Sequence, residues 1–183
     1  MQLVDTTLFF SPTSGGVKRY LTAKHAWLAA RGTHRHSILV PGAHDSLQPG
    51  GISTIAGVRL PFTFNYRLPL SPRRWTRMLF ALEPDLIEAG DVFHPAWCAA
   101  RVARARNIPL VAFFHSNLAH VIGRRFGAGV ESAIARYVHR VYAQCDLVLA
   151  PSRLMCTYLA KLGVARSAYQ ERTVSPSTAS VQR

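Results

Sequence analysis

Short apolar runs alternate along the chain with longer segments in which apolar residues recur every three or four positions. The run at 108–114 is nearly continuous, as in a strand that is buried on both faces of a parallel sheet. Strands that alternate with helices are joined by right-handed crossovers, so the pattern predicts one α/β domain with a doubly wound parallel sheet. The predicted strands are an opening apolar stretch and residues 35–40, 84–88, 108–114 and 145–150, and the predicted helices include 95–107, about 128–144 and a last one closed by Gly163.

A Gly-Gly pair, Gly15 and Gly16, lies between the opening strand and the first predicted helix. Glycine lets the backbone pass close to a ligand, and the N–H groups in the first turn of a helix attract an anion. Lys18 and Arg19 add positive charge beside the pair. The loop therefore predicts a phosphate-binding site, and a pair that serves only as a tight turn is the open alternative.

The length and the cysteines narrow the class of protein. A chain of 183 residues can bury the core of one such domain, whereas two full domains would be cramped. Its three cysteines, Cys98, Cys145 and Cys156, show no C-x-x-C spacing, so neither a disulfide framework nor a zinc site is indicated. No apolar run approaches the roughly 18 residues of a membrane span, and Asp5 interrupts any leader-like stretch. We expect a cytosolic protein.

The net charge of +13 is suited to an anionic partner. The cations are almost all arginines spread over several elements, without a long basic tract interleaved with aromatics, which argues against nucleic-acid binding. On a helix that begins near Pro72, Arg73, Arg74 and Arg77 fall on one side and Trp75 lies among the apolar residues of the other. These four residues predict a surface for an anionic lipid or acceptor at the inner face of a membrane. An ordinary amphipathic surface helix is the alternative.

Four segments resemble, in their order along the chain, landmarks of the family 4 glycosyltransferases. They are residues 15–20, 83–88, 114–117 and 145–152. The resemblance covers residues 3 to about 163 and is to the N-terminal, acceptor-side half of a two-domain fold known as GT-B, whose halves are Rossmann-like. Within the family, the chain is similar to bacterial enzymes that transfer mannose or glucose to lipids.

This resemblance implies the transfer of a hexose from a nucleotide-sugar, such as a GDP- or UDP-hexose, to a hydroxyl acceptor with retention at the anomeric carbon. It implies no bound metal, no cofactor and no protein nucleophile. Catalysis would then depend on holding the acceptor near the anomeric carbon and on stabilising the departing diphosphate.

The resemblance also assigns roles to residues. Gly15 and Gly16 would approach the pyrophosphate of the donor and the acceptor. His115, directly after a buried strand, would face the interdomain cleft and contact the donor sugar, which makes it the catalytic candidate. Asn117 would orient His115, and Ser152 would open the final helix. A hydrogen-bonded structural histidine and a simple N-cap are the alternatives for His115 and Ser152.

The chain departs from the family after about residue 163. The family's second domain holds most of the nucleotide-sugar and carries two glutamates separated by seven residues, a pair that this sequence lacks. We expect a glycosyltransferase domain over 1–163 and a disordered or aberrant tail over 164–183, as a truncated or frameshifted coding sequence would give.

Two functional classes stay open at this point, an enzyme half on the one hand and a noncatalytic module or remnant on the other. The chain is the acceptor-side half of a transferase that needs a second polypeptide, a noncatalytic module for anionic lipid or a nucleotide, or an inactive remnant. A Rossmann-type cofactor protein is disfavoured because the opening loop lacks the full G-x-G-x-x-G pattern.

Overall fold

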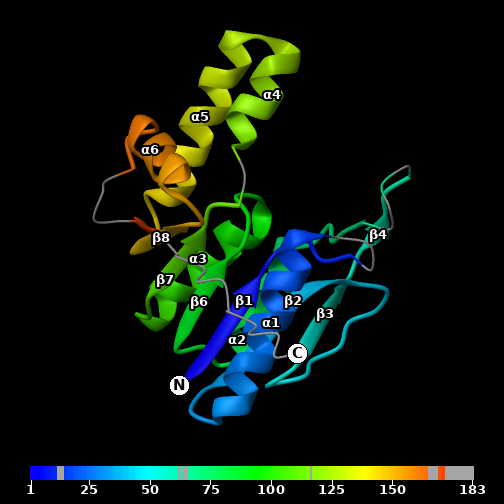
Figure 1. The fold of residues 1–183 in the computed structure, drawn as a ribbon. Helices are drawn as coiled ribbons and strands as arrows, with labels where there is room; N and C mark the ends of the chain where they lie inside the picture. The colour runs from blue at the N-terminus through cyan, green and yellow to red at the C-terminus, as the bar shows by residue number, and fades with distance from the viewer. Residues whose placement is uncertain (12–14, 62, 64–65, 116, 165–168, 172–183) are drawn as a thin grey trace, which may run out of the picture.

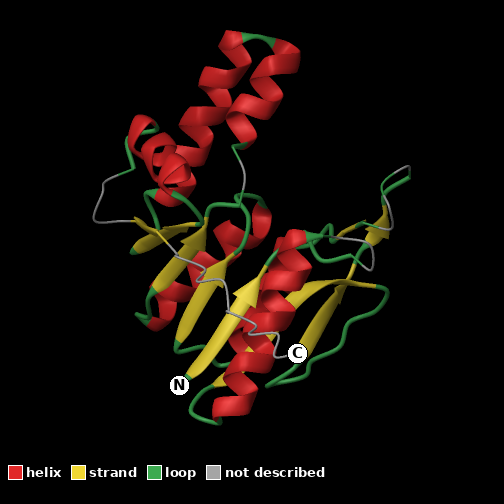
Figure 2. Cartoon of the chain, in the orientation of Figure 1, coloured by secondary structure: helices red, strands yellow, loops and turns green. Residues whose placement is uncertain are grey.

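The central feature of the computed structural model is a seven-stranded parallel sheet in the order β3-β2-β1-β6-β7-β8-β9 (Figures 1 and 2). A small antiparallel pair, β4 and β5, lies outside this sheet. The structure describes residues 1–11, 15–61, 63, 66–115, 117–164 and 169–171. The strands are β1 (Gln2–Thr6), β2 (Arg35–Gly42), β3 (Ile52–Ala56), β4 (Val58–Arg59), β5 (Arg67–Leu68), β6 (Leu86–Ala89), β7 (Leu110–Phe113), β8 (Leu147–Ala150) and β9 (Tyr169–Glu171).

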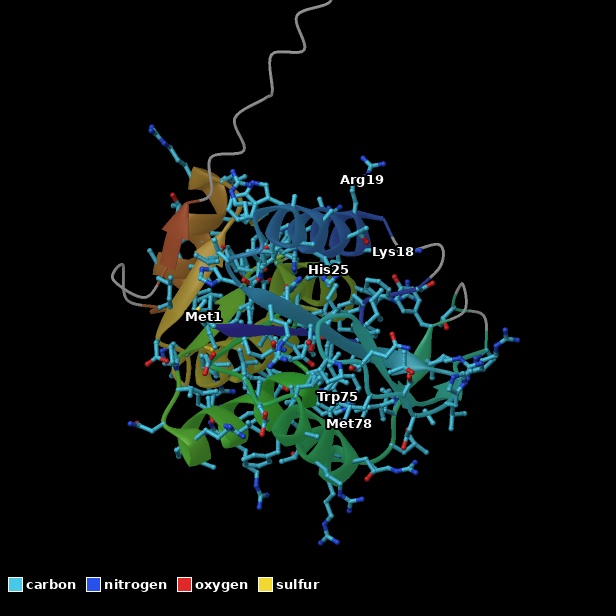
Figure 3. All side chains as sticks on the ribbon, turned by 90° about the horizontal axis from the view of Figure 1, so that it is seen from below. Met1, Lys18, Arg19, His25, Trp75 and Met78 are labelled. Carbon is cyan, nitrogen blue, oxygen red and sulfur yellow. The ribbon has the colours of Figure 1, made fainter. Side chains whose placement is uncertain are left out.

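Helices cover both faces of the sheet. Helix α1 lies on one face, and α2 and α3 lie on the other, as the view along the sheet shows (Figure 3). The alternation of β1 fixes this arrangement, because successive side chains point to opposite faces: Asp5 contacts Lys24 of α1, and Thr6 accepts a hydrogen bond from Trp75 of α2. The helices are α1 (Gly16–Arg31), α2 (Pro72–Ala81), α3 (His94–Arg106), α4 (Leu118–Phe126), α5 (Ala128–Tyr142) and α6 (Arg153–Lys161).

The predicted class, a doubly wound parallel sheet, is confirmed. The apolar runs form β2, β6, β7 and β8, and every residue of β1 and β7 is buried. The sequence did not predict β3, β4, β5, β9 and α4. Strand β3 buries only alternate residues at the edge of the sheet, so it lacks a continuous apolar run. Helix α4 forms an antiparallel hairpin with α5 that projects beyond the carboxyl ends of the strands (Figure 1).

Helix α2 carries the predicted cationic side, but its tryptophan is not on the surface. Trp75 is 0% exposed, and its indole N–H donates a hydrogen bond of 2.9 Å to the Thr6 hydroxyl. The predicted surface of Arg73, Arg74, Trp75 and Arg77 therefore loses Trp75, because the apolar side of α2 covers the sheet. The three arginines stay exposed on the outer side. This is the arrangement of an ordinary amphipathic surface helix.

The segment after residue 163 differs from the expected tail over the few residues that the structure describes. Val164 is buried in the main core, and Tyr169–Glu171 form β9, which pairs in parallel with β8. Pairing through main-chain hydrogen bonds requires no apolar periodicity, which is why the pattern of side chains did not predict this strand. The rest of the predicted tail, 165–168 and 172–183, lies outside the described residues.

Candidate functional site

A cavity of about 380 Å³ opens at the carboxyl ends of β1, β6 and β7, where open parallel sheets bind their ligands. It collects residues from loops that are far apart in the sequence, including Gly15, Gly16 and His115, which the sequence predicted as site residues. The lining residues are Phe9, Gly15, Gly16, Val17, Tyr66, Gly90, Asp91, Val92, Phe93, Phe113, Phe114, His115, Leu118, Val138 and Tyr142.

The N-terminus of α1 forms one wall of this cavity. Gly15 is its N-cap residue and has no side chain with which to cap the helix, and the first turn holds no acidic residue. The first N–H groups of a helix have no partner within the helix, and the dipole places positive charge at this end. Both features favour an anion such as a phosphate group at Gly15 and Gly16.

The two glycines are not explained by the fold of the described residues. Neither has a positive φ, and a Cβ built on either would meet no atom within 4 Å. Neither a left-handed backbone conformation nor close packing against the described residues therefore requires glycine at these two positions. The open space in front of them is where a ligand would approach the backbone.

His115, two residues after the end of β7, also lines this cavity. Its ring stacks on Phe113, with 4.2 Å between the ring centroids, and meets the edge of the Tyr20 ring at 6.0 Å. Burial lowers the pKa of His115 to about 4, although the negative charge of Asp5 acts to raise it. The imidazole is therefore neutral near pH 7 and can donate or accept one hydrogen bond to a ligand.

Asp91 is a lining residue that the sequence did not predict. One carboxylate oxygen accepts hydrogen bonds from the Leu8 N–H at 2.6 Å and from the Thr7 hydroxyl at 3.0 Å, and the other accepts from the Phe93 N–H at 2.9 Å. Burial raises the pKa of Asp91 despite these bonds. It ties the loop after β1 to the loop after β6. Its place just after an apolar strand is the same signal that singled out His115.

Aromatic rings make up much of the remaining wall. Phe9 stands between Tyr66 and Phe93, with ring centroids 6.2 Å and 5.7 Å away in edge-to-face geometry. Phe114 and Tyr142 meet edge to face deeper in the cavity, at 6.0 Å. Such walls exclude water and suit the apolar face of a sugar ring or another neutral group. These residues were missed because they come from five separate segments.

The two predicted cations of α1 do not line this cavity. Lys18 lines a neighbouring cavity of about 390 Å³ together with Phe10, Arg59 and Arg67, and its ammonium group is 5.9 Å from the Phe10 ring centroid. Arg19 is exposed and points outward from α1 (Figure 3). Lys18 and Arg19 therefore contribute to the cavity of Gly15 and Gly16 only through long-range electrostatic attraction.

Asn117 and Ser152 act as helix caps in this structure. The Asn117 side chain accepts a hydrogen bond from the His120 N–H at 2.9 Å and begins α4, and the Ser152 hydroxyl accepts from the Met155 N–H at 3.3 Å and begins α6. Neither lines the cavity. For Ser152 this matches the simple capping role that the sequence left open. An orienting role of Asn117 toward His115 stays a prediction.

The three arginines of α2 lie away from the cavity of Gly15 and His115. Arg73 and Arg77 line a separate groove of about 720 Å³ between α2 and α3, together with Arg101 and Trp97. Arg74 forms an exposed ion pair of 3.2 Å with Asp45.

Metal sites and membrane spans are both absent from the part of the chain that the structure describes. No group of three or more His, Cys, Asp and Glu side chains is arranged there to hold a metal ion. No helix among the described residues combines the length and the apolar character that a membrane-spanning segment needs.

Among curated proteins, the chain has a relative with a named activity. It is 26% identical over 161 residues to a GDP-mannose-dependent alpha-mannosyltransferase of Corynebacterium glutamicum. The match covers 85% of this chain and 39% of that protein, so the chain spans about two fifths of the length of its relative.

Solved structures show the same partial coverage. The sucrose-phosphate synthase of Thermosynechococcus elongatus matches with a TM-score of 0.62 at 15% identity, over 93% of this chain and 47% of that one. The Anabaena protein HepE, solved with UDP and glucose, matches with a TM-score of 0.59 at 15% identity, over 93% and 44% of the two chains.

A UDP-GlcNAc 2-epimerase from Neisseria meningitidis also matches, with a TM-score of 0.54 at 12% identity, over 93% of this chain and 46% of that one. Enzymes with different reactions thus share this half of a GT-B fold, and the fold alone does not specify the chemistry. The family is decided by the sequence, because the profile of Glycosyltransferase Family 4 matches residues 14–170. The chain belongs to Glycosyltransferase Family 4, and it corresponds to one of the two halves of a GT-B fold.

Proposed function

We propose that this chain is the acceptor-side half of a retaining hexosyltransferase that uses a nucleotide-sugar donor. The observation that carries the proposal is the meeting of the N-terminus of α1, at Gly15 and Gly16, with the neutral imidazole of His115 in one cavity. The two glycines leave the backbone accessible to a ligand, and packing against the described residues does not require glycine at either position.

Each wall of the cavity has a role in this proposal. The N–H groups of the first turn of α1 stabilise the negative charge that develops on the departing diphosphate. His115 donates a hydrogen bond to the transferred sugar. The aromatic residues hold the acceptor hydroxyl close to the anomeric carbon and exclude water, which would otherwise compete as acceptor.

The donor is proposed to be a GDP- or UDP-hexose. The Corynebacterium relative is named for GDP-mannose, and HepE was solved with UDP and glucose. The chain spans less than half of each of these proteins, and the proposal includes a donor-side half that completes the site. A noncatalytic nucleotide-binding or lipid-binding module and an inactive remnant are the alternatives.

The exposed arginines of α2 suggest where an anionic acceptor or a membrane surface would gather. Arg73, Arg74 and Arg77 are all exposed, and Arg73 and Arg77 share a groove with Arg101. Three or four such cations attract anionic headgroups electrostatically. Since Trp75 is buried, this contact is proposed as purely electrostatic, at the inner face of the cell membrane.

Reconstitution tests the proposal. The chain is coexpressed with the donor-side half of the Corynebacterium relative, and mannose transfer from GDP-mannose to a membrane-lipid extract is measured against each half alone. We expect transfer only when both halves are present, and its loss in His115→Ala. A stable, GDP-mannose-binding complex that transfers no sugar would support the noncatalytic alternative.

A further inference from the structure

Two carboxylates lie side by side in the middle of the sheet. Asp5 of β1 and Glu88 of β6 are register partners on neighbouring strands, and their side chains are 2% and 7% exposed. The ammonium group of Lys24, on α1, lies 2.8 Å from an oxygen of each. One cation thus bridges two buried acids, and it comes from the helix that begins at Gly16.

Further polar groups extend this cluster. The Nε2 atom of His36 on β2 lies 2.6 Å from the second carboxylate oxygen of Asp5, and the Tyr20 hydroxyl donates to the second oxygen of Glu88 at 3.0 Å. His25 and His36 face each other with 3.1 Å between their Nδ1 atoms. The cluster therefore joins three strands to α1, and both carboxylates use both of their oxygens.

The charge of Lys24 is essential to this arrangement. Burial alone would lower the pKa of Lys24, but the charges of Asp5 and Glu88 outweigh burial and raise it above its ordinary value. Burial, and then repulsion from Asp5, raise the pKa of Glu88, while the contacts with Lys24 and Tyr20 act to lower it. Without the ammonium group, two buried carboxylates would repel each other across neighbouring strands.

The apolar packing of helix α1 is limited. Of its side chains only Leu21 and Leu28 are buried, so it lacks the broad apolar stripe by which surface helices usually pack. The charged cluster supplies a large part of the attachment of α1 to the sheet.

The cluster reaches the candidate site through Tyr20. The Tyr20 ring lies 5.0 Å from the Phe113 ring and 6.0 Å from the His115 ring, centroid to centroid, while its hydroxyl group is bound to Glu88. One turn earlier, α1 presents Gly16 to the cavity. The position of α1 thus sets both walls of the site.

We propose that Lys24 is a positioning residue: by bridging Asp5 and Glu88 it locks α1 against the sheet, and so holds the Gly15–Gly16 backbone and the Tyr20 ring in register with His115. The functional value of this lock rests on the proposed function, but the lock itself is measured without activity or ligand. Its failure is therefore distinguishable from failure of the proposed function.

The experiment compares Lys24→Met with the charge-balanced variant Asp5→Asn/Lys24→Met/Glu88→Gln. Amide hydrogen exchange of Tyr20 and Leu21 reports on α1, and the titration of the His115 ring, followed by NMR between pH 4 and pH 8, reports on the site. In Lys24→Met we expect protection of the two amides to fall at least about tenfold, as local opening becomes easier.

The His115 titration has a defined direction. The ring is covered by Phe113 and Tyr20, and Asp5 is the charge that acts on it. Loss of Lys24 exposes the ring and leaves Asp5 uncompensated, so the His115 pKa rises from about 4 toward its ordinary value of 6.5. In the charge-balanced variant the His115 pKa rises less, because Asp5 no longer carries a charge.

Two controls separate positioning from general damage. Lys161→Met makes the same change at an exposed lysine of α6 and should leave both readouts unchanged. If Lys24→Met does not fold, Tyr20→Phe removes the hydroxyl that donates to Glu88 and should weaken protection of the α1 amides while α3 keeps its own. A folded Lys24→Met with unchanged exchange and His115 titration overturns the proposal. So does a charge-balanced variant that regains full protection of the two amides, because this variant also lacks the bridge.

Discussion

The imidazole of His115 stacks on the phenyl ring of Phe113, with 4.2 Å between the centroids and 29° between the ring planes. This contact, together with the Tyr20 ring, buries the imidazole at the edge of the cavity. Burial favours the neutral form and lowers the pKa of His115 to about 4. The site therefore holds a neutral hydrogen-bonding group at physiological pH.

The first prediction concerns stability against pH. Because the pKa of His115 falls from 6.5 in the unfolded chain to about 4 in the folded one, the unfolded state binds more protons between these values. The stabilisation is fully present above pH 6.5 and is lost as the pH falls toward 4. We expect His115 to account for about 2 kcal/mol of the loss in unfolding free energy between pH 7 and pH 5.

Urea unfolding of the wild type and of His115→Gln at the two pH values measures this share. The lowered pKa values of His25 and His94 act in the same direction but are common to both proteins and cancel in the difference. An equal pH dependence in both proteins would show that His115 is not buried in its neutral form.

The second prediction concerns turnover. In a reconstituted enzyme, His115→Ala should lower kcat at least about 100-fold, the usual range for a group that handles a proton or a hydrogen bond at the reacting centre. Unfolding free energy should change by no more than about 1–2 kcal/mol, because the ring is half-buried at the edge of the cavity. His120→Ala, at an exposed position of α4, is the matched control. Unchanged turnover in His115→Ala would remove the residue from the site.

The third prediction separates the binding and folding roles of the glycine pair. A Cβ at Gly16 would meet no described atom within 4 Å, and alanine is at least as good as glycine inside a helix. Gly16→Ala should therefore keep or raise the melting temperature and yet weaken binding of inorganic pyrophosphate, because the methyl group occupies the path to the backbone.

Gly129→Ala is the control for this change. A Cβ at Gly129 would also meet no described atom within 4 Å, but this glycine lies on α5, outside the cavity lining. Equal pyrophosphate affinity of Gly16→Ala, Gly129→Ala and the wild type would contradict a phosphate site at α1.

The fourth prediction concerns Trp75. Since its side chain is 0% exposed and its N–H donates to Thr6, Trp75→Ala should cost about 3–5 kcal/mol of unfolding free energy. Trp27→Ala, at a tryptophan that is 54% exposed and stacked on Arg31, should cost about 1 kcal/mol or less. Similar losses for the two variants in urea unfolding would disagree with the buried position of Trp75.

The fifth prediction concerns the three exposed arginines of α2. The variant Arg73→Gln/Arg74→Gln/Arg77→Gln should bind vesicles that contain anionic lipid at least about tenfold more weakly in a sedimentation assay, since each cation near such a surface contributes about 1 kcal/mol.

The control for this assay removes equal charge elsewhere. Arg124, Arg136 and Arg140 are exposed on the α4–α5 hairpin, and their replacement by glutamine should have a smaller effect. Equal weakening in both variants would mean that only net charge attracts the vesicles.

The sequence predicts the central sheet because its strands are buried on both faces. Neighbouring residues such as Ile38 and Leu39, or Val111 and Ala112, are both buried, one on each face of the sheet. The sequence therefore shows continuous apolar runs, which amphipathic helices and surface loops do not have. Strand β3 was not predicted because this edge strand buries only every second residue. Strand β9 was not predicted because main-chain pairing requires no particular pattern of side chains. Trp75 was assigned to the surface because periodicity gives the side of a helix but not what that side faces.

The site is predictable only where function coincides with a strand end or a glycine pair. His115 and Gly16 stand next to such elements, and the structure places both in one cavity. Asp91 follows a strand in the same way but makes bonds that only the folded chain reveals. The Asp5–Lys24–Glu88 cluster could not be predicted from the sequence, because its three charges come from separate segments that only the folded chain brings together.

The most direct test of a phosphate site between α1 and His115 is an NMR titration of the chain with GDP and with UDP, with guanosine as the control that lacks phosphate groups. We expect saturable shifts of the Gly16, Val17 and Lys18 amides and of the His115 ring with both diphosphates, and none of these shifts with guanosine. Saturable binding that leaves these four signals in place, or no shift at millimolar GDP and UDP, would contradict such a site.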